Sequence, residues 1–433
     1  MNPPTDPTAV PPAGAPPAGG RPTGVPPTGR HRTGHEAFGR RAGSGPGLVC
    51  ASNGVRSARA YLLRVAEPPA PALARLVAER GPVAAARMVR RRQVPPDVAA
   101  ETEARHGFDD TEADLAAAGA VGARLVIPED DEWPRWPFTA FERAAARGVV
   151  EAVAPLALWV RGPGRLDELT ERAVAVVGAR AATAYGEHVA SEFGYGLAGR
   201  GRTVVSGAAY GIDGAAHRGA LAAEGDTIAV LACGVDVPYP SGHLELLRRV
   251  AEHGAVISEY PPATPPGRHR FLVRNRLIAG LAEGTVVVEA GIRSGARNTA
   301  NLTTLLGRVL MAVPGPVTSA ASIGCHDLLR SHAAILVSSV DEVIESTGRL
   351  GADLVSARDR PARPTDGLDL PELRVHESLL PRAGRPTEWV ARDSGVPLVS
   401  VRSALSRLEQ LGLAERCESG WRRGPASRPR GGA

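Results

Sequence analysis

The chain contains no lysine, because all 51 of its basic residues are arginine. This absence excludes chemistry that needs a side-chain amine, such as a Schiff-base nucleophile or a phosphate loop ending in Gly-Lys-Ser. Arginine suits two-pronged contacts with phosphates and stacking on flat rings. A GC-rich genome also produces a high arginine content, so only the position of each arginine is informative.

Cysteines and long apolar runs are also scarce. The four cysteines, at positions 50, 233, 325 and 417, are far apart and form no Cys-x-x-Cys pair. We therefore expect no metal site and no dithiol redox motif, and free thiols in a chain of this length fit a reducing cytoplasm. No apolar run approaches ~18 residues and no signal-peptide core is present, so we expect a cytoplasmic protein without a membrane span.

The net charge of +5 comes from the two ends of the chain. Residues 1–46 contain five arginines and two acidic residues, and residues 421–433 contain four arginines and no acidic residue. Ten prolines fall within the first 27 positions. Such a segment cannot bury enough apolar surface to offset its ordering entropy. We predict a disordered Pro/Gly-rich tail at 1–46 and a basic disordered tail at 424–433.

Helical patterns follow the first tail. Apolar residues at helical spacing stop at Pro68-Pro69, resume, and stop again at Gly81-Pro82, after which a third pattern covers 83–92. These patterns predict a small helical module over 47–114.

Seven short apolar runs alternate with helical patterns in the middle of the chain. They lie at 174–177, 203–205, 227–232, 255–257, 285–288, 309–313 and 334–337. Continuous apolar runs separated by helices are typical of βαβ units in a parallel sheet covered on both faces. We predict an α/β fold with a doubly wound parallel sheet over 115–347.

The last part of the chain has a different pattern. Residues 348–367 are rich in Asp, Arg and Pro and are predicted to be a linker. Three helical patterns, at 370–380, 387–394 and 399–411, precede a predicted β-hairpin at 413–423. This order is typical of a winged helix, which we predict over 368–423. Its candidate contacts with duplex DNA are Arg402, Arg407, Arg422 and Arg423.

Ligands of doubly wound sheets bind outside the carboxyl ends of the strands, so the residues directly after each strand are candidates. Gly178 and Arg180 follow the first run, and Ser206, Gly207 and Tyr210 follow the second. Glycine at such turns brings backbone N–H groups close to an anion. The first turn lacks the further glycines of a dinucleotide fingerprint, so we expect no nucleotide cofactor.

The densest basic cluster of the predicted α/β domain follows the fourth run. It contains Arg268, Arg270, Phe271, Arg274, Asn275 and Arg276. A ring stacks on an unpaired base and guanidinium groups bind phosphates, as single-stranded nucleic acid requires. The alternative is a core phenylalanine on a solvated turn. Ser294 and Gly295, after the fifth run, are a second candidate anion cradle.

These segments resemble the DprA/Smf family of bacterial DNA-processing proteins over about residues 120–345. The shared motifs occur in family order at 177–180, 206–207, 211–213, 217, 234, 238–240, 258–261, 271–280, 289–290, 294–295, 299–300 and 313–316. The chain departs from the family at Tyr210, where arginine is usual, and at 324–329, where the family often has an asparagine before a Leu-Ile pair.

The resemblance implies an extended Rossmann-like domain that holds single-stranded DNA and loads the RecA recombinase, in DNA-mediated transformation (competence) and recombination. It assigns a strand-binding role to Arg180, base stacking to Phe271 and a further basic contact to Arg268. It also implies flanking SAM-like and winged-helix modules and a cytoplasmic homodimer formed through the α/β domain. It implies no catalytic residue, metal or cofactor.

Two other functions stay open from the residues alone. Glu259 and Glu289 follow predicted strands and are a possible acid–base pair for a Rossmann-like nucleotide hydrolase. Such hydrolases carry a Pro-Gly-Gly loop that this chain lacks. The other function is a transcription regulator that reads duplex DNA through the winged helix. We expect Asp213 to cap a helix and His217 to be packed rather than catalytic.

Overall fold

We describe the protein from a computed structural model, which covers residues 46–150, 152–348 and 364–425. The predicted tails lie almost entirely outside these residues, as does most of the predicted linker. The segment that ends at residue 348 and the segment that begins at residue 364 are described separately below.

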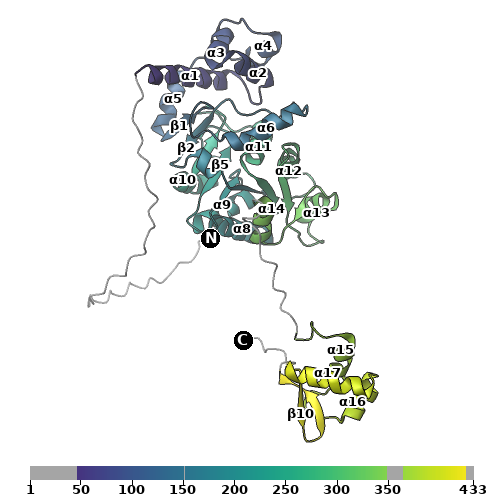
Figure 1. Cartoon of the computed structure of the whole chain (residues 1–433). Helices are drawn as coiled ribbons and strands as arrows, with labels where there is room; N and C mark the ends of the chain where they lie inside the picture. Colours follow the sequence, from purple (N-terminus) through teal and green to yellow (C-terminus); the bar gives the residue numbers. More distant parts are fainter. Residues whose placement is uncertain (1–45, 151, 349–363, 426–433) are drawn as a thin grey trace, which may run out of the picture. The chain divides into compact units, whose positions relative to one another are not determined.

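Five helices form the N-terminal part of the described chain (Figure 1). They are α1 (Pro46–Val65), α2 (Pro71–Arg80), α3 (Pro82–Arg90), α4 (Pro96–Thr102) and α5 (Thr111–Ala120). The first two end just before the predicted breakers, and proline lies in the first turn of α2, α3 and α4, where its missing N–H costs nothing. The core that α1 to α4 share is centred on Tyr61, Leu62 and Leu73, which are fully buried.

A nine-stranded sheet follows, in the order β1-β2-β6-β5-β4-β3-β7-β8-β9. Its strands are β1 (Ala123–Val126), β2 (Leu158–Arg161), β3 (Ala173–Val177), β4 (Thr203–Ser206), β5 (Thr227–Leu231), β6 (Ala255–Ser258), β7 (Gly284–Val287), β8 (Val309–Ala312) and β9 (Ile335–Leu336). The strands β3 to β9 are parallel and coincide with the seven predicted runs. The predicted α/β class is therefore confirmed.

Two strands of this sheet were not predicted. The β1 and β2 strands form an antiparallel hairpin that pairs with β6, so the sheet is mixed at this edge. Each has four residues and includes an arginine, and the short apolar runs at 125–127 and 156–160 do not alternate with helices in the way the parallel strands do. The pairing with β6 is a long-range contact that sequence periodicity does not register.

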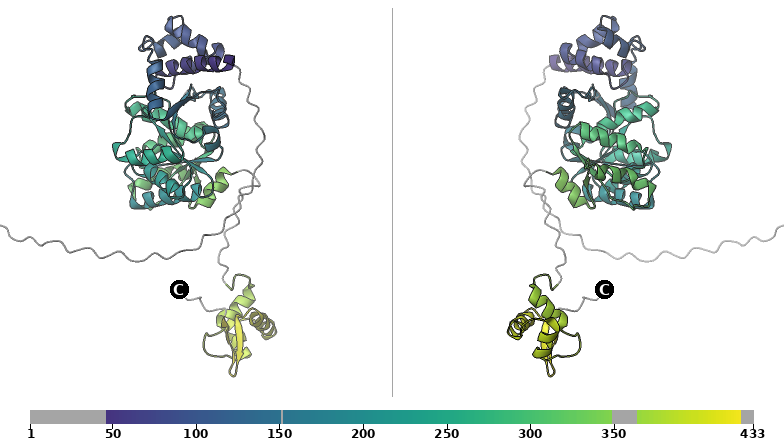
Figure 2. Two further views of the ribbon diagram at one scale, coloured as in Figure 1. Left: turned by 90° about the vertical axis from the view of Figure 1, so that its left-hand side faces the viewer. Right: turned by 90° about the vertical axis from the view of Figure 1, so that its right-hand side faces the viewer.

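Helices cover both faces of the sheet (Figure 2). These are α6 (Arg135–Ala146), α7 (Leu166–Leu169), α8 (Ala184–Ala198), α9 (Ile212–Ala222), α10 (Leu244–His253), α11 (Arg268–Leu281), α12 (Gly295–Leu305), α13 (Ile323–Arg330) and α14 (Val340–Thr347), with short 3-10 turns at Ser241–His243 and Ala320–Ser322. Alternate residues of β3 belong to different cores: Ala175 packs with α6 and α11, and Val176 packs with α8 and α9.

The strand order reverses direction at β3. Along the chain the sheet grows from β3 through β4 and β5 to β6, and α11 then returns to place β7 on the other side of β3. Crevices form where neighbouring crossovers leave in opposite directions, at the carboxyl ends of the strands. The loops after β3 and β7 flank this reversal point.

The C-terminal module of residues 364–425 has its own core. It comprises α15 (Leu370–Ser378), α16 (Thr387–Ser394), α17 (Leu398–Gln410) and the hairpin of β10 (Ala414–Cys417) and β11 (Gly420–Arg423). Val375, Val390, Leu405 and Trp421 meet in that core. The order of three helices and a hairpin agrees with the prediction, and a winged-helix function in DNA binding stays a prediction.

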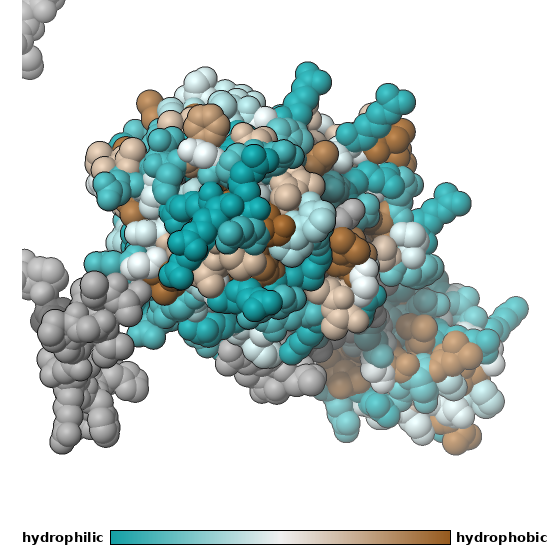
Figure 3. Space-filling model, turned by 90° about the horizontal axis from the view of Figure 1, so that it is seen from above, coloured by the Kyte–Doolittle hydropathy of each residue, from teal (hydrophilic) through white to brown (hydrophobic). Residues whose placement is uncertain are grey.

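Figure 3 shows the face of the molecule seen from above, where hydrophilic side chains predominate and hydrophobic ones are scattered among them. Across the described residues, no helix combines the length and the apolar character that a membrane crossing requires.

Candidate nucleic-acid interface

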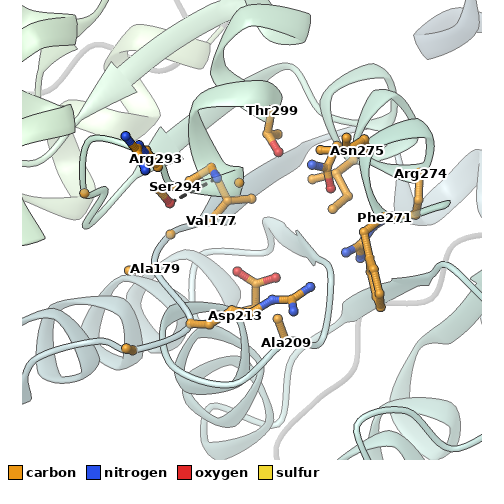
Figure 4. A pocket seen from close by; sticks show the side chains of 18 of the residues that line it. Val177, Ala179, Ala209, Asp213, Phe271, Arg274, Asn275, Arg293, Ser294 and Thr299 are labelled. Carbon is orange, nitrogen blue, oxygen red and sulfur yellow. Dashed lines mark hydrogen bonds between the residues drawn. The ribbon is translucent and has the colours of Figure 1, made fainter. Parts of the chain in front are cut away.

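A cleft of about 960 Å³ opens at the reversal point of the sheet. Its walls come from the turn after β3, the loop after β4, the first half of α11 and the loop that leads from β7 into α12 (Figure 4). The eight predicted site residues that line it are Gly178, Arg180, Arg268, Phe271, Arg274, Asn275, Ser294 and Gly295. The structure thus brings together residues that are more than a hundred positions apart in the sequence.

A smaller cavity of about 40 Å³ adjoins the cleft. Gly207 and Tyr210 line it, together with Arg180 and Phe271, which the two cavities share. The hydroxyl of Tyr210 accepts a hydrogen bond from the backbone N–H of Gly242, at 3.3 Å. Ten of the twelve predicted residues therefore lie at these two connected cavities.

An aromatic ring and a guanidinium group face each other across the cleft. The guanidinium carbon of Arg180 lies 4.8 Å from the centroid of the Phe271 ring. The Tyr239 ring is 5.4 Å from the Phe271 ring and tilted by 41°. Phe271 is only partly buried, so part of its ring faces the cleft.

The exposed cations of the cleft are Arg180, Arg268 and Arg293. Among the residues that the structure describes, none of the three forms an ion pair with a carboxylate. Asp213 is the one acidic residue among those that line the cleft. The cleft is therefore electropositive and its exposed guanidinium groups keep their hydrogen-bond donors available for an anion.

Arg274 lies under the Phe271 ring and is 4% exposed. Its guanidinium donates to the carbonyl of Val230, at the end of β5. Burial lowers the pKa of Arg274 to about 10, so the group stays charged at neutral pH. A Cβ on Gly207 would lie 2.1 Å from Nη1 of Arg274, so this close approach requires glycine.

Asp213 is tied to the backbone of the loops. Its Oδ2 accepts a hydrogen bond from the N–H of Gly207, at 3.2 Å. Burial raises the pKa of the Asp213 carboxyl, and the charge of Arg274 and the backbone donors oppose that shift. The side chain lies in the first turn of α9, where it joins that helix to the loop after β4.

Ser206 and Arg276 line neither cavity, although both belong to the predicted site. The Ser206 hydroxyl is buried and donates to the carbonyl of Val176 at 2.6 Å. Arg276 is buried against Glu259, with Nη2 at 2.7 and 2.6 Å from the two carboxylate oxygens. Both residues support the walls of the cleft from inside.

Backbone groups at both ends of the turn after β3 form internal hydrogen bonds. The N–H of Ala179 donates to the carbonyl of Glu289 at 2.8 Å, and the carbonyl of Ala179 accepts from Ile212 at 3.3 Å. The Glu289 carboxylate accepts from the N–H and the hydroxyl of Thr183, at the start of α8. The side chain of Arg180 supplies a positive charge here.

The far end of the cleft is the start of α12. Ser294 caps this helix, with its hydroxyl accepting from the N–H of Ala296 at 3.2 Å. Thr299 and Asn275 point toward the same space (Figure 4), and Asn275 donates to Asn298 at 3.0 Å. Helix N-termini favour anions because their N–H groups point outward.

The set predicted from the sequence lacks Arg293 and Tyr239. Each lies in the loop after a strand, Arg293 after β7 and Tyr239 after β5. The expectation that ligands bind at the carboxyl ends of the strands, which selected Arg180, therefore applies to both residues. His217 is fully buried, with Nδ1 at 2.7 Å from the Thr227 hydroxyl, in line with a packed side chain.

Three of the four arginines proposed for duplex DNA in the C-terminal module are engaged within it. Arg407 pairs with Glu372 at 3.2 Å and Arg422 with Glu415 at 2.7 Å. Arg423 donates to the carbonyl of Glu377 at 3.2 Å. Arg402 is exposed on α17 and forms no ion pair with any described residue.

Comparisons with known proteins give a consistent result. The family described as DNA recombination-mediator protein A matches residues 124–348. The putative DNA processing protein DprA of Mycobacterium tuberculosis is 53% identical over 84% of this chain and 93% of its own length. The structure of DNA processing protein A from Streptococcus pneumoniae has a TM-score of 0.53 and 28% identity, covering 68% of this chain and 96% of that one.

A structure of DNA processing protein A from Helicobacter pylori, described by its single-stranded DNA binding mode, is 28% identical with a TM-score of 0.41. It covers 45% of this chain and 87% of that one.

Proposed function

The chain belongs to the DNA recombination-mediator protein A (DprA/Smf) family, and from this membership we propose that it binds single-stranded DNA in the cleft and delivers it to the RecA recombinase. The role that we propose is DNA processing in recombination and in DNA uptake. The observation that carries the proposal is that exposed, unpaired arginines line the same cleft as the Phe271 ring, with Arg180 against that ring.

Each part of the cleft has a role in this proposal. Arg180, Arg268 and Arg293 bind successive phosphates, because exposed guanidinium groups form two-pronged contacts with phosphate oxygens. One unpaired base stacks on Phe271, and the adjacent Tyr239 ring widens the stacking surface. The start of α12 accepts a further phosphate at the other end.

This arrangement favours single strands of any sequence. Stacking requires an unpaired base, and every base has a flat face, so the contact is independent of sequence. In a duplex the bases are paired and stacked on one another, so Phe271 has no access to a base face. Phosphate contacts release counterions, and affinity should therefore fall steeply as salt increases.

We infer a binding protein rather than an enzyme. The two carboxylates that suggested a nucleotide hydrolase are engaged elsewhere: Glu259 pairs with Arg276, and Glu289 holds the start of α8. Both are buried, and neither lines the cleft. Release of free base from nucleoside monophosphates by the purified protein would restore the hydrolase proposal.

We also propose a homodimer, formed through the α/β domain, and a cytoplasmic site of action. The edge strand β9 supports the dimer, because Ile335 and Leu336 are exposed apolar residues on an edge with free pairing capacity. The cytoplasm is supported by the thiols of Cys233, Cys325 and Cys417, which are free.

A salt-titrated binding assay with single- and double-stranded oligomers tests the function. The wild type should prefer the single strand, and the Arg180→Ala/Phe271→Ala double variant should lose that preference. Equal affinity of the wild type for both oligomers, or full affinity of the double variant, would reject the proposal.

A further inference from the structure

The N-terminus of α11, the helix that carries Phe271, lacks the usual stabilising residues. Its N-cap is Gly267, which has no capping side chain, and its first turn contains no acidic residue. It instead begins with the basic residues Arg268, His269 and Arg270. The N-terminus of a helix carries a partial positive charge, so cations there are unfavourable. The first turn of α11 therefore needs a negative charge that its own sequence does not provide.

Glu67, between α1 and α2, provides that charge. Its carboxylate accepts from Arg270 Nε at 2.7 Å and Nη2 at 3.1 Å, and lies 3.1 Å from His269 Nε2. Arg105, at the end of the α4 region, donates to the same carboxylate at 2.6 Å. One acidic residue of the helical module thus places a negative charge against the first turn of a helix about two hundred positions away.

The charge state of Glu67 suits this role. Burial by itself raises its pKa, but the hydrogen bonds from Arg270, Arg105 and His269 outweigh burial and lower the pKa to about 2. The carboxylate is therefore ionised throughout the neutral range. Its side chain is only 27% exposed, so solvent screens these contacts less than it screens a surface ion pair.

Arg270 is fixed on further sides. Its Nη1 donates to the carbonyl of Pro265 at 2.6 Å, and its guanidinium lies 5.1 Å from the centroid of the Tyr260 ring. Its side chain is 13% exposed. The next residue is Phe271, and Arg268 lies two positions earlier. Any displacement of Arg270 therefore moves both of these cleft residues with the backbone of the turn.

We propose that Glu67 is a positioning residue for the DNA cleft: through Arg270 it holds the first turn of α11 so that Phe271 and Arg268 face the strand. This inference rests on the proposed function. It gives the helical module a direct part in DNA binding although, among the residues that line the cleft, none comes from that module.

The test is a double-mutant cycle in the full-length protein with a labelled oligothymidine. Glu67→Gln should weaken binding about three- to tenfold, less than the loss of the ring itself, because the turn is loosened rather than removed. In the Phe271→Ala background, Glu67→Gln should have a clearly smaller effect than in the wild type, because most of its influence passes through the ring. Arg270→Gln should reproduce the loss, and combining it with Glu67→Gln should add nothing.

Glu129→Gln is the matched control, because it breaks another ion pair between the helical module and the α/β domain, with Arg59 of α1 at 2.8 Å, that involves no residue of α11. It should bind DNA like the wild type. If Glu67→Gln does not fold by thermal melting, Arg270→Gln and its cycle with Phe271→Ala replace it. Wild-type affinity for Glu67→Gln, or equal losses in both backgrounds, would overturn the inference. Failure of the wild type itself to bind would instead reject the proposed function.

Discussion

The cleft and the C-terminal module both carry several arginines, but these arginines have different surroundings. In the cleft, Arg180, Arg268 and Arg293 are exposed and lack carboxylate partners among the described residues. Asp213 is the one acidic residue among those that line the cleft. In the module, residues 364–425 contain nine arginines and nine acidic residues, and two of the predicted contacts, Arg407 and Arg422, are paired.

This difference shows that the number of arginines is a poor guide to a nucleic-acid site. The contribution of a guanidinium group to phosphate affinity depends on the charges around it and on how many of its N–H donors are free. A glutamate beside an arginine offsets its positive charge and takes up part of its donor capacity, so that arginine attracts a phosphate less strongly. Whether arginines without carboxylate partners, rather than many arginines, separate the two regions can be tested by substitutions in both.

The largest expected effect is on Arg180→Ala/Phe271→Ala. Loss of stacking and of one phosphate contact should cost roughly 2–4 kcal/mol of affinity for single-stranded DNA. Fluorescence anisotropy at fixed salt measures it. The control is Arg249→Ala/Phe108→Ala, which removes the same two residue types at exposed positions outside the cleft and should leave affinity unchanged. Equal losses of affinity in both double variants would show that the cleft is not the binding site for single-stranded DNA.

Gly207→Ala tests the buried arginine of the cleft. Its added methyl group would meet the guanidinium of Arg274, which is enclosed and cannot move without losing its bond to Val230. We expect a destabilisation of roughly 1–3 kcal/mol from overpacking, measured by urea unfolding, with weaker DNA binding. Gly119→Ala is the control, because Gly119 lies outside the cleft and a Cβ there meets nothing within 4 Å. Unchanged stability of Gly207→Ala would mean that Arg274 is mobile.

A smaller effect is expected from single removals of the exposed cations. Arg268→Ala and Arg293→Ala should each reduce the slope of log affinity against log salt by about 0.7, because each exposed arginine neutralises one phosphate. The slope is measured between low and moderate salt with the same oligomer. A slope identical to that of the wild type would remove the affected arginine from the DNA path.

The smallest effects are expected in the C-terminal module. Arg407→Ala and Arg422→Ala should change duplex and single-strand affinity by less than about twofold, because exposed ion pairs contribute little and the module has no net charge. Glu415→Gln frees Arg422 and should slightly increase affinity for any DNA. A large loss of duplex affinity in Arg422→Ala would instead support a winged helix that reads duplex DNA.

Much of the fold and the cleft was predictable from the sequence because both depend on local patterns. The parallel strands are short apolar runs, and the residues after them form one rim by the geometry of such sheets. This reasoning found Arg180, Arg268 and Phe271 and placed them together. Phe271 was distinctive because only 4% of the chain is aromatic.

Other features depend on contacts that no local pattern contains. Arg276 and Ser206 are polar residues of the kind that usually lie on the surface. All residues of α11 from Arg274 to its end are buried, and Arg276 forms a buried ion pair with Glu259. The Ser206 hydroxyl is buried as well. The contact between Glu67 and Arg270 joins two distant segments. It becomes visible only when the helical module is packed.

The cleft is assembled from the turn after β3, the loop after β4, the crossover helix α11 and the start of α12, which lie between residues 177 and 299. Each segment alone presents at most one or two cations. A chain still emerging from the ribosome cannot grip a strand before α12 has left the exit tunnel and β7 has docked beside β3. The cleft is therefore complete only after most of the α/β domain has been synthesised.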